Sequence, residues 1–424
     1  MSKQKEIIDK IDKDFGKTFC VKPFTEIATS SVGHMKLCCF SRSVGSNNMS
    51  YYENNFAKVF HNNDDLRSIR KEMLEGKRIK ECRNCYIEEK AGKVSQRQEE
   101  NLIMYNENRK TFDDIVNNGT AIIKSIDLKF GNKCNYACIM CDTGSSSLHT
   151  KEIEANPHPD DVKQVINFEP YYFDFPDEKM DDLLSISSNL VSVKSTGGEP
   201  FLLDGFKDYI KKLVEKGYAK NIDFRTVSNG TIDCSDLLPY MNQFKSFTIS
   251  WSIDGTDKVY NFIRYPGRFD RMSRIHKAVA KSVMDNNYYN IKLKLDPTIQ
   301  LFNVHNIIDL LRYADSLKVI KLVEMGYIYR DPRYLDVSLM PYEMLCEIFH
   351  KADREIKNVS VPNNYEDIKK LVFQKYDEWR PEQKQEIFQL TQSMVRYWKR
   401  VRKMEVRDHI DFYNTLVHYY DRDK

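Results

Sequence analysis

Strand-like and helix-like hydrophobic patterns alternate through the middle of the chain. Short apolar runs are typical of buried strands, and apolar residues at helical spacing predict amphipathic helices. The helical patterns include 206–216 and 303–317. The alternation predicts βα units that form a parallel sheet. The strand-like runs are 122–130, 190–195, 221–227, 246–252, 291–298 and 318–325.

The patterns on either side of this middle part are different. The N-terminal part has strand-like pieces at 24–28 and 34–37, a helical pattern at 65–74 and a charged helical stretch at 86–108. The C-terminal part is helical in pattern throughout. Its candidate helices are 344–356, 365–376 and 381–404. We therefore expect three domains, at 1–112, 118–336 and 337–424.

A polar stretch at 143–178, with several prolines, interrupts the alternation after the first central strand. Long loops within compact domains are usually lids, binding loops or disordered segments. We interpret this stretch as an insertion on the substrate side, with a passive insertion as the alternative.

Composition excludes several classes of protein. The 424 residues leave room for two or three domains, and the net charge is +3. A dedicated nucleic-acid or membrane-surface protein would carry a larger basic excess. No apolar run approaches the roughly 20 residues that span a bilayer. The first fifteen residues are charged and lack the apolar core of a signal peptide, so we expect a cytoplasmic protein.

Cysteine supplies the first candidate chemistry. Eight of the ten cysteines precede residue 142, in tight groups. Disulfide frameworks belong to small secreted domains, so this clustering favours metal or iron–sulfur ligation in a reducing compartment. The two isolated cysteines, Cys234 and Cys346, are interpreted as packing residues.

Three cysteines share one short loop directly after the first central strand. Cys134, Cys138 and Cys141 have the spacing C-x3-C-x2-C. A closed iron–sulfur site usually takes four cysteine ligands, so three thiolates indicate a cubane cluster with one iron open to another ligand. A zinc site completed by His149 and simple buried cysteines are the alternatives.

A second motif ends the next strand, at Gly197-Gly198-Glu199-Pro200. Two glycines let the backbone approach a ligand closely, and the carboxylate can accept hydrogen bonds from an ammonium group. Together with the cysteine loop, this turn resembles the signature of radical S-adenosylmethionine (SAM) enzymes. The resemblance implies a partial (β/α)6 TIM-like barrel with its chemistry at the carboxyl ends of the strands.

The resemblance also implies an activity. A 4Fe-4S cluster on the three loop cysteines would bind SAM and receive an electron from a donor such as flavodoxin or ferredoxin. Reductive cleavage of SAM would then give a 5′-deoxyadenosyl radical that abstracts hydrogen from a substrate. The enzyme would be of oxidoreductase or transferase type.

Further residues match the family's SAM site. The resemblance places Tyr136 near the adenine and the Gly197-Gly198-Glu199 turn near the amino group. Arg264 could pair with the SAM carboxylate, with a structural ion pair as the alternative. Asp254 could cap a turn instead of binding a ligand. Three residues at strand ends are expected near the ribose or carboxylate: Ser228, Asn229 and Ser252.

The N-terminal cysteines resemble a different module. Cys20 and Cys38 lie on either side of a glycine, and the pair Cys82 and Cys85 follows. This pattern is similar to the SPASM/Twitch auxiliary-cluster domain, here placed before the barrel, and implies a second 4Fe-4S cluster. Cys39 is an alternative to Cys38. A four-cysteine zinc site fits the same pattern.

The resemblance leaves the substrate open. SPASM/Twitch relatives mostly modify peptides or proteins, so a peptide or protein substrate is expected, with a carbohydrate or nucleotide as the alternative. A non-catalytic zinc or iron–sulfur protein is a hypothesis of another class. The Gly197-Gly198-Glu199 turn argues against that class, because a structural metal protein has no use for a SAM-binding turn.

Overall fold

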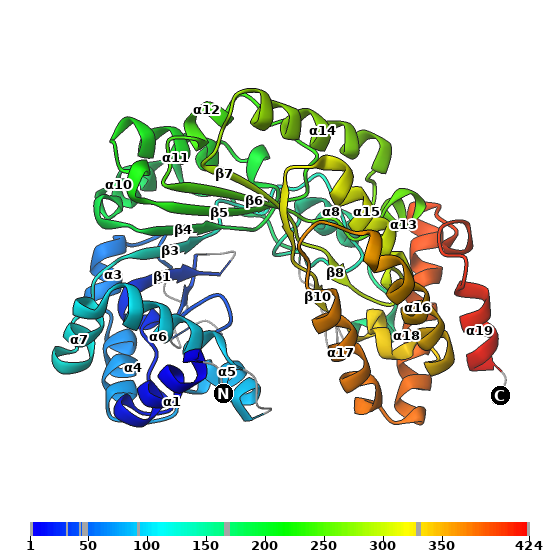
Figure 1. Cartoon of the computed structure of the whole chain (residues 1–424), viewed down its shortest axis with the longest axis horizontal. Helices are drawn as coiled ribbons and strands as arrows, with labels where there is room; N and C mark the ends of the chain where they lie inside the picture. The colour runs from blue at the N-terminus through cyan, green and yellow to red at the C-terminus, as the bar shows by residue number, and fades with distance from the viewer. Residues whose placement is uncertain are drawn as a thin grey trace.

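The computed structural model describes residues 3–30, 33–41, 44, 50–90, 94–164, 170–327 and 332–421. Its centre is an eight-stranded sheet in the order β2-β1-β3-β4-β5-β6-β7-β9. Figure 1 shows the N-terminal helices below one end of this sheet and the C-terminal helices on the opposite side of the molecule. The fold is therefore α/β, with a largely parallel sheet at its centre.

Six parallel strands follow one another along the sheet in chain order. They coincide with the six strand-like runs of the sequence, so this prediction is confirmed. The sheet has two edges, β2 and β9, and the partial barrel is not closed in the described part of the chain. The strands are β3 (Ser125–Leu128), β4 (Ser192–Ser195), β5 (Asp223–Ser228), β6 (Ser246–Trp251), β7 (Ile291–Leu295) and β9 (Ile320–Val323).

The N-terminal region contributes to the same sheet. Strand β1 (Glu26–Thr29) pairs in parallel with β3, with Ile27 opposite Ile126. Strand β2 (Met35–Lys36) pairs antiparallel with β1. The hydrogen-bonded sheet thus crosses the boundary expected at 112–118, while the division into three domains stays a prediction.

Alternation along the strands gives the sheet two different faces. In β5, Phe224 and Thr226 are buried while Arg225 between them is exposed, and β7 repeats this pattern around Lys292. Helix α11 (Asp204–Glu215) covers the apolar face with Phe206 and three other buried side chains. Figure 1 shows α11 and α14 (Phe269–Asp285) along this outer side. We call the opposite, polar face the inner face.

The remaining helices around the sheet differ in length, from four residues in α9 and α12 to 17 in α14. Those on the outer side or between strands are α8 (Ser147–Ala155), α9 (Asp160–Lys163), α10 (Met180–Ser185), α12 (Leu238–Met241), α13 (Asp257–Ile263), α14 (Phe269–Asp285) and α15 (Ile307–Leu317). Helices α8 and α9 lie in the polar stretch 143–178, of which residues 165–169 are outside the described part. A separate two-stranded sheet pairs β8 (Thr298–Ile299) with β10 (Gly326–Tyr327).

The single charged helix expected at 86–108 is wrong. The structure has two helices there, α5 (Arg83–Lys90) and α6 (Gln96–Glu107). Ser95 has extended backbone angles and caps α6, and Gln98 completes a capping box. The Ser-x-x-Gln spacing is a helix-start signal that the charged pattern concealed. The other N-terminal helices are α1 (Lys3–Phe15), α2 (Lys22–Thr25), α3 (Phe56–Asn62), α4 (Asp64–Leu74) and α7 (Arg109–Asn118).

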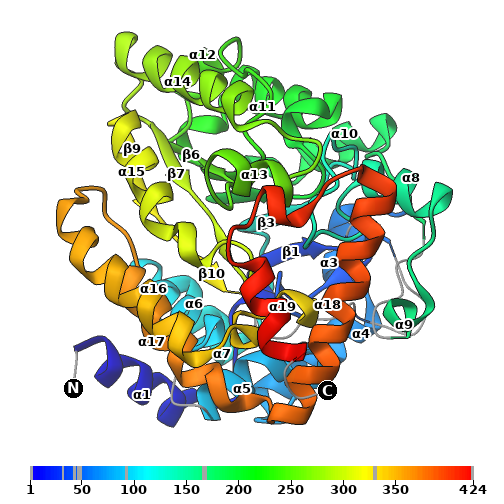
Figure 2. The ribbon, with the colours of Figure 1, turned by 90° about the vertical axis from the view of Figure 1, so that its right-hand side faces the viewer.

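The C-terminal region is helical as predicted. Its helices are α16 (Tyr342–Glu355), α17 (Tyr365–Lys375), α18 (Pro381–Arg402) and α19 (Tyr413–Asp421). Figure 2 shows this group in front of the strands. At the end of α18, Arg402 forms a buried ion pair with Glu152 of α8, at 2.7 Å. The C-terminal helices are thereby joined to the segment that follows the cysteine loop. No helix in the described ranges is long and apolar enough to cross a membrane.

Candidate functional site

A cavity of about 230 Å³ lies at the carboxyl ends of the central strands. All three cysteines of the C-x3-C-x2-C loop line it. So do all the other residues predicted for SAM binding except Glu199: Tyr136, Gly197, Gly198, Ser228, Asn229, Ser252 and Arg264. The structure thus brings together side chains from four strand ends that are far apart in sequence.

The cysteine loop is held by main-chain hydrogen bonds on two sides. The N–H of Cys134 donates to Ser147 Oγ at 3.2 Å, at the start of α8. Further along, the N–H groups of Ala137 and Ile139 donate to the carbonyls of Tyr265 and Ile263, at 2.7 and 3.0 Å. The loop is therefore fixed between α8 and the segment that follows α13.

The Gly-Gly-Glu turn also contacts the cysteine loop. Gly198 has φ +56°, and a Cβ atom there would lie 2.6 Å from the carbonyl oxygen of Lys133. The N–H of Glu199 donates to that same oxygen at 2.8 Å. Only glycine permits this approach, so the turn and the residue before Cys134 form one unit.

The carboxylate of Glu199 is fully buried and already has three donors. Its Oε1 accepts from Ser228 Oγ at 2.8 Å and from the Phe201 N–H at 3.2 Å. Its Oε2 accepts from the Asn229 N–H at 2.6 Å. Burial raises the pKa of Glu199 to about 7, against the lowering effect of these hydrogen bonds. Glu199 therefore joins the ends of β4 and β5, and its contact with SAM stays a prediction.

The side chain of Asn229 makes two polar contacts beside Cys134, the first cysteine of the loop. Asn229 Nδ2 donates to Asn135 Oδ1 at 2.8 Å and lies 3.8 Å from the sulfur of Cys134.

Tyr136, which is buried, lies with its hydroxyl 3.0 Å from that of Tyr260. The ring of Tyr136 is thereby fixed at the cavity wall, and its contact with adenine remains a prediction.

Arg264 forms an ion pair inside the protein. Its Nε donates to Asp254 Oδ2 at 2.5 Å, and its Nη1 lies 3.7 Å from the sulfur of Cys138. Asp254 is fully buried and also accepts from the Thr298 N–H at 2.7 Å. The structural ion pair considered from the sequence is therefore present, while a contact of Arg264 with the SAM carboxylate remains a prediction.

Sequence reasoning missed some residues of the site. Lys129 and Thr196 line the cavity directly after β3 and β4, and Ser145 lines it from the loop before α8. Lys133 was also overlooked, although its carbonyl holds the Gly-Gly-Glu turn. Position just beyond a strand end was the available signal for the first two, because active sites of βα folds gather there.

The donors of this site fit a cluster with one open iron. Burial raises the pKa of the Cys134 thiol to about 12 and raises those of Cys138 and Cys141 as well, so the bare thiols are protonated at neutral pH. Coordination to iron removes those protons. No fourth Cys, His, Asp or Glu lines the cavity among the described residues.

His149, the proposed zinc ligand, is buried in α8 against the backbone of Cys141 and is not a lining residue. Burial lowers the pKa of His149 to about 3. Within the described ranges, no three His, Cys, Asp or Glu side chains meet as ligands around a single metal ion.

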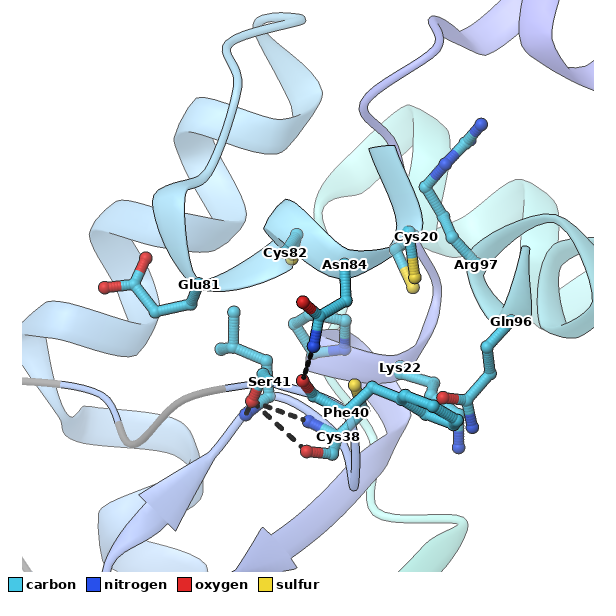
Figure 3. Close-up of a pocket in the computed structure, with 13 residues that line it drawn as sticks. Cys20, Lys22, Cys38, Phe40, Ser41, Glu81, Cys82, Asn84, Gln96 and Arg97 are labelled. Atoms are coloured by element: carbon cyan, nitrogen blue, oxygen red, sulfur yellow. Dashed lines mark hydrogen bonds between the residues drawn. The ribbon is translucent and has the colours of Figure 1, made fainter. Parts of the chain in front are cut away.

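The four predicted N-terminal cysteines line a second, smaller cavity of about 20 Å³ (Figure 3). Cys20 precedes α2 and Cys38 follows β2, whereas Cys82 lies directly before α5 and Cys85 lies in its first turn. Cys39 does not line this cavity, and Gln96 Nε2 lies 3.4 Å from its sulfur. Cys38 rather than Cys39 thus lies at this cavity, while metal ligation there and the choice between zinc and an iron–sulfur cluster remain predictions.

Two buried cations border this second cavity. Arg97 pairs with Asp12 and Glu89, each at 2.8 Å. Lys22 pairs with Glu26 at 2.5 Å. Because each cation has carboxylate partners, the cavity is bordered by compensated charges rather than by isolated ones.

A family model covers the part of the chain that carries the first cavity. Residues 128–294 match the model of the radical SAM superfamily. This part of the chain is therefore similar to radical SAM domains. It contains the cysteine loop, the Gly-Gly-Glu turn and the Asp254–Arg264 pair. The protein is accordingly an enzyme, and the superfamily uses a 4Fe-4S cluster and SAM, which the three thiols and the cavity fit.

Solved structures of radical SAM enzymes show a distant likeness. Streptococcus suis SuiB bound to S-adenosylmethionine is 14% identical over 78% of this chain and 69% of that chain, with a TM-score of 0.41. SuiB bound to the precursor peptide SuiA is 12% identical over 74% and 65%, with a TM-score of 0.41.

Coproporphyrinogen III oxidase (HemN) from Escherichia coli, a radical SAM enzyme, is 12% identical over 65% of this chain and 52% of that chain, with a TM-score of 0.29. The chain thus spans between half and about two thirds of the length of these enzymes. No curated protein matches the sequence.

Proposed function

We propose that this enzyme binds a 4Fe-4S cluster on Cys134, Cys138 and Cys141, binds SAM in the adjoining cavity, and modifies a peptide or protein by hydrogen abstraction. One observation carries the proposal: three thiols of one loop share a cavity with Gly197 and Gly198, without a fourth metal-binding side chain among the described lining residues. When bound there, the cluster and SAM would supply a 5′-deoxyadenosyl radical.

The residues around the cavity would hold SAM in place. Gly197 and Gly198 present backbone without side chains. Ser252 and Asn229 add polar groups at the ends of β6 and β5, and Tyr136 adds an aromatic ring. Buried side chains on several sides would keep water from the reacting atoms, which is what the protein contributes when the cofactor carries the chemistry.

The inner face of the sheet supports a chain-like substrate. Lys194, Arg225 and Lys292 lie in one row across the strands, because the register joins them through Thr248. Arg225 and Lys292 are exposed, although strands of a parallel sheet are usually covered on both faces. An extended peptide could lie along this polar face and reach the strand ends.

We further propose a second 4Fe-4S cluster on Cys20, Cys38, Cys82 and Cys85. The meeting of these four thiols at one cavity supports it, together with the resemblance of their spacing to SPASM/Twitch domains. A small electron-transfer protein such as flavodoxin or ferredoxin would be the donor.

Anaerobic reconstitution tests the first part of the proposal. The wild type should become brown, and after reduction it should convert SAM to methionine and 5′-deoxyadenosine. The variant C134A/C138A/C141A should give none of that product. A Cys346→Ala variant serves as the control, because Cys346 is a half-buried residue of α16 outside both cavities, and it should form 5′-deoxyadenosine as the wild type does. Product from the triple variant would refute the assignment.

The substrate is tested by comparing cells that contain the active enzyme with cells that contain the triple variant. A mass change confined to peptides or proteins would support the proposal. A change confined to small metabolites would favour the carbohydrate or nucleotide alternative.

A further inference from the structure

The contact between Arg264 and Cys138 lies at the wall of the SAM cavity. Arg264 Nη1 is 3.7 Å from the Cys138 sulfur, a separation at which this large atom can still accept an N–H. Both residues are buried, with exposed fractions of 9% and 6%. Because little water reaches the pair, the contact is stronger than it would be at the surface.

Asp254 fixes the direction of this guanidinium. Its Oδ2 accepts from Arg264 Nε at 2.5 Å, and its Oδ1 accepts from the Thr298 N–H at 2.7 Å. Its main-chain carbonyl accepts from Asn303 Nδ2 at 3.1 Å. The carboxylate is thus attached to the segment beyond β7 as well as to β6, and it cannot turn away from Arg264 without losing a hydrogen bond.

The backbone holds both ends of the contact in register. Arg264 N–H donates to the Tyr260 carbonyl at 2.8 Å. The residues before and after it, Ile263 and Tyr265, accept the N–H groups of Ile139 and Ala137, which flank Cys138. Two short peptide segments therefore lie side by side, with Arg264 and Cys138 at their centre.

The surroundings of Arg264 favour the charged form of its guanidinium. Burial opposes the charge of Arg264, but Asp254 lies 2.5 Å from its Nε and supplies the opposite charge. A fixed positive donor beside a cluster sulfur stabilises the form with one more electron, since hydrogen bonds to sulfur and local charge set the potential of iron–sulfur clusters.

We propose that Arg264 donates an N–H···S hydrogen bond to the cluster ligand Cys138 and thereby raises the reduction potential of the SAM-binding cluster, and that Asp254 is the positioning residue that aims it. This inference rests on the proposed function, because it takes the cluster to be bound on Cys134, Cys138 and Cys141. It gives Arg264 a role that exists before SAM binds.

The test is a redox titration, followed by electron paramagnetic resonance, of reconstituted full-length protein without SAM. The relevant signal is the one absent from C134A/C138A/C141A. In R264Q we expect a more negative midpoint potential, by a tenfold or larger change in the reduction equilibrium, which is about 59 mV for one electron. In R264K the charge remains but the planar fork is lost, so the shift should be smaller.

D254N tests the positioning role. The Asn side chain keeps the shape and can still accept from the Thr298 N–H, but it no longer holds the guanidinium by charge. We expect a shift in the same direction as in R264Q, because loss of the N–H···S contact should lower the potential by more than removal of the carboxylate charge raises it. The matched control is R268Q, because Arg268 belongs to the same connecting segment, is exposed and pairs only with Asp270 among the described residues.

Each outcome supports or overturns the inference. A midpoint potential equal to wild type in R264Q, with weaker SAM binding, would mean that Arg264 serves only the SAM carboxylate. An unchanged potential with a lower melting temperature would mean that the ion pair is only structural. If R264Q does not fold, R264K and D254N decide by the same measurement. If iron never binds at the three cysteines of the wild type, the proposed function fails and this inference fails with it.

Discussion

The backbone N–H of Glu199 donates to the carbonyl oxygen of Lys133 at 2.8 Å, next to the first cysteine of the loop. Two motifs that are far apart in sequence are therefore parts of one structure. The turn after β4 not only faces the cavity but also sets the position at which the cysteine loop begins. A substitution that shifts the backbone of this turn, as at Gly198, should therefore affect metal binding as well as SAM binding.

Gly198→Ala should reduce iron uptake at the three-cysteine loop. The new Cβ would lie 2.6 Å from the Lys133 carbonyl oxygen, so the loop must move. A left-handed backbone conformation also raises the conformational energy of a residue other than glycine by roughly 1–2 kcal/mol. Gly217→Ala is the matched control, because it has φ +70° and open space around its Cβ position. Equal iron content in both variants would show that the close approach is unimportant.

Glu199→Ala should weaken SAM binding while both clusters remain. A charge-assisted hydrogen bond contributes roughly 1.5–3 kcal/mol, which corresponds to about ten- to a hundredfold in affinity. The variant should also melt at a lower temperature, because three donors around the carboxylate lose their acceptor. Titration of SAM against the reduced-cluster signal separates the effects. A lower melting temperature with unchanged SAM affinity would leave Glu199 only as the connection between β4 and β5.

The reconstituted wild type should contain about eight irons per chain, as expected for two cubane clusters. C134A/C138A/C141A should retain about half, because the second set of cysteines lines a separate cavity. Elemental analysis of both proteins checks this. About four irons and one zinc in the wild type would assign the N-terminal site to zinc.

Cys38→Ser and Cys39→Ser should behave differently. Cys38 lines the four-cysteine cavity, whereas the sulfur of Cys39 lies beside Gln96. We expect the Cys38 variant to lose the N-terminal metal and the Cys39 variant to keep it. Metal content per chain and the absorption spectrum provide the measurement, and each variant serves as the control for the other. The reverse result would exchange the two ligands.

Acid should destabilise the fold partly through His276. Burial against Trp251, with ring centroids 3.9 Å apart, lowers the pKa of His276 to about 3. Between about 6.5 and 3 the unfolded chain binds a proton that the folded chain does not, so stability falls as pH falls. Between pH 7 and pH 5, the depressed pKa of His276 should lower the free energy of unfolding by about 2 kcal/mol.

His276→Phe preserves an aromatic ring on Trp251 and should lose less stability over that pH interval than the wild type. Chemical denaturation at the two pH values measures the difference. His418→Gln is the control, because His418 is exposed. An equal pH dependence in wild type and His276→Phe would contradict the assignment.

Local periodicity predicted the six central strands because each strand buries alternate or continuous apolar residues within its own few positions. It could not predict that β1 joins β3, since that pairing links residues about a hundred positions apart. It also missed the break at Ser95, where a capping box was hidden by surrounding charge.

The cysteine loop and the Gly-Gly-Glu turn were recognisable because their chemistry depends on spacing. The direction of an individual side chain could not be predicted from the sequence. The Glu199 carboxylate accepts hydrogen bonds from Ser228 and from the Asn229 N–H, and Asp254 is directed at Arg264. Such orientations depend on neighbours contributed by other strands, which a single sequence does not reveal.

The pairing of β1 with β3 has a consequence for electron transfer. Cys20 precedes β1, Cys38 follows β2, and Cys134 follows β3, so both cysteine groups are attached to neighbouring strands of one sheet. If a hinge separated the two cysteine groups, the distance between metals bound to them could change when substrate binds. Here the ladder of backbone hydrogen bonds joins the strands that carry these cysteines, so an electron passing between the two proposed clusters would cross the same distance in the resting and in the working enzyme.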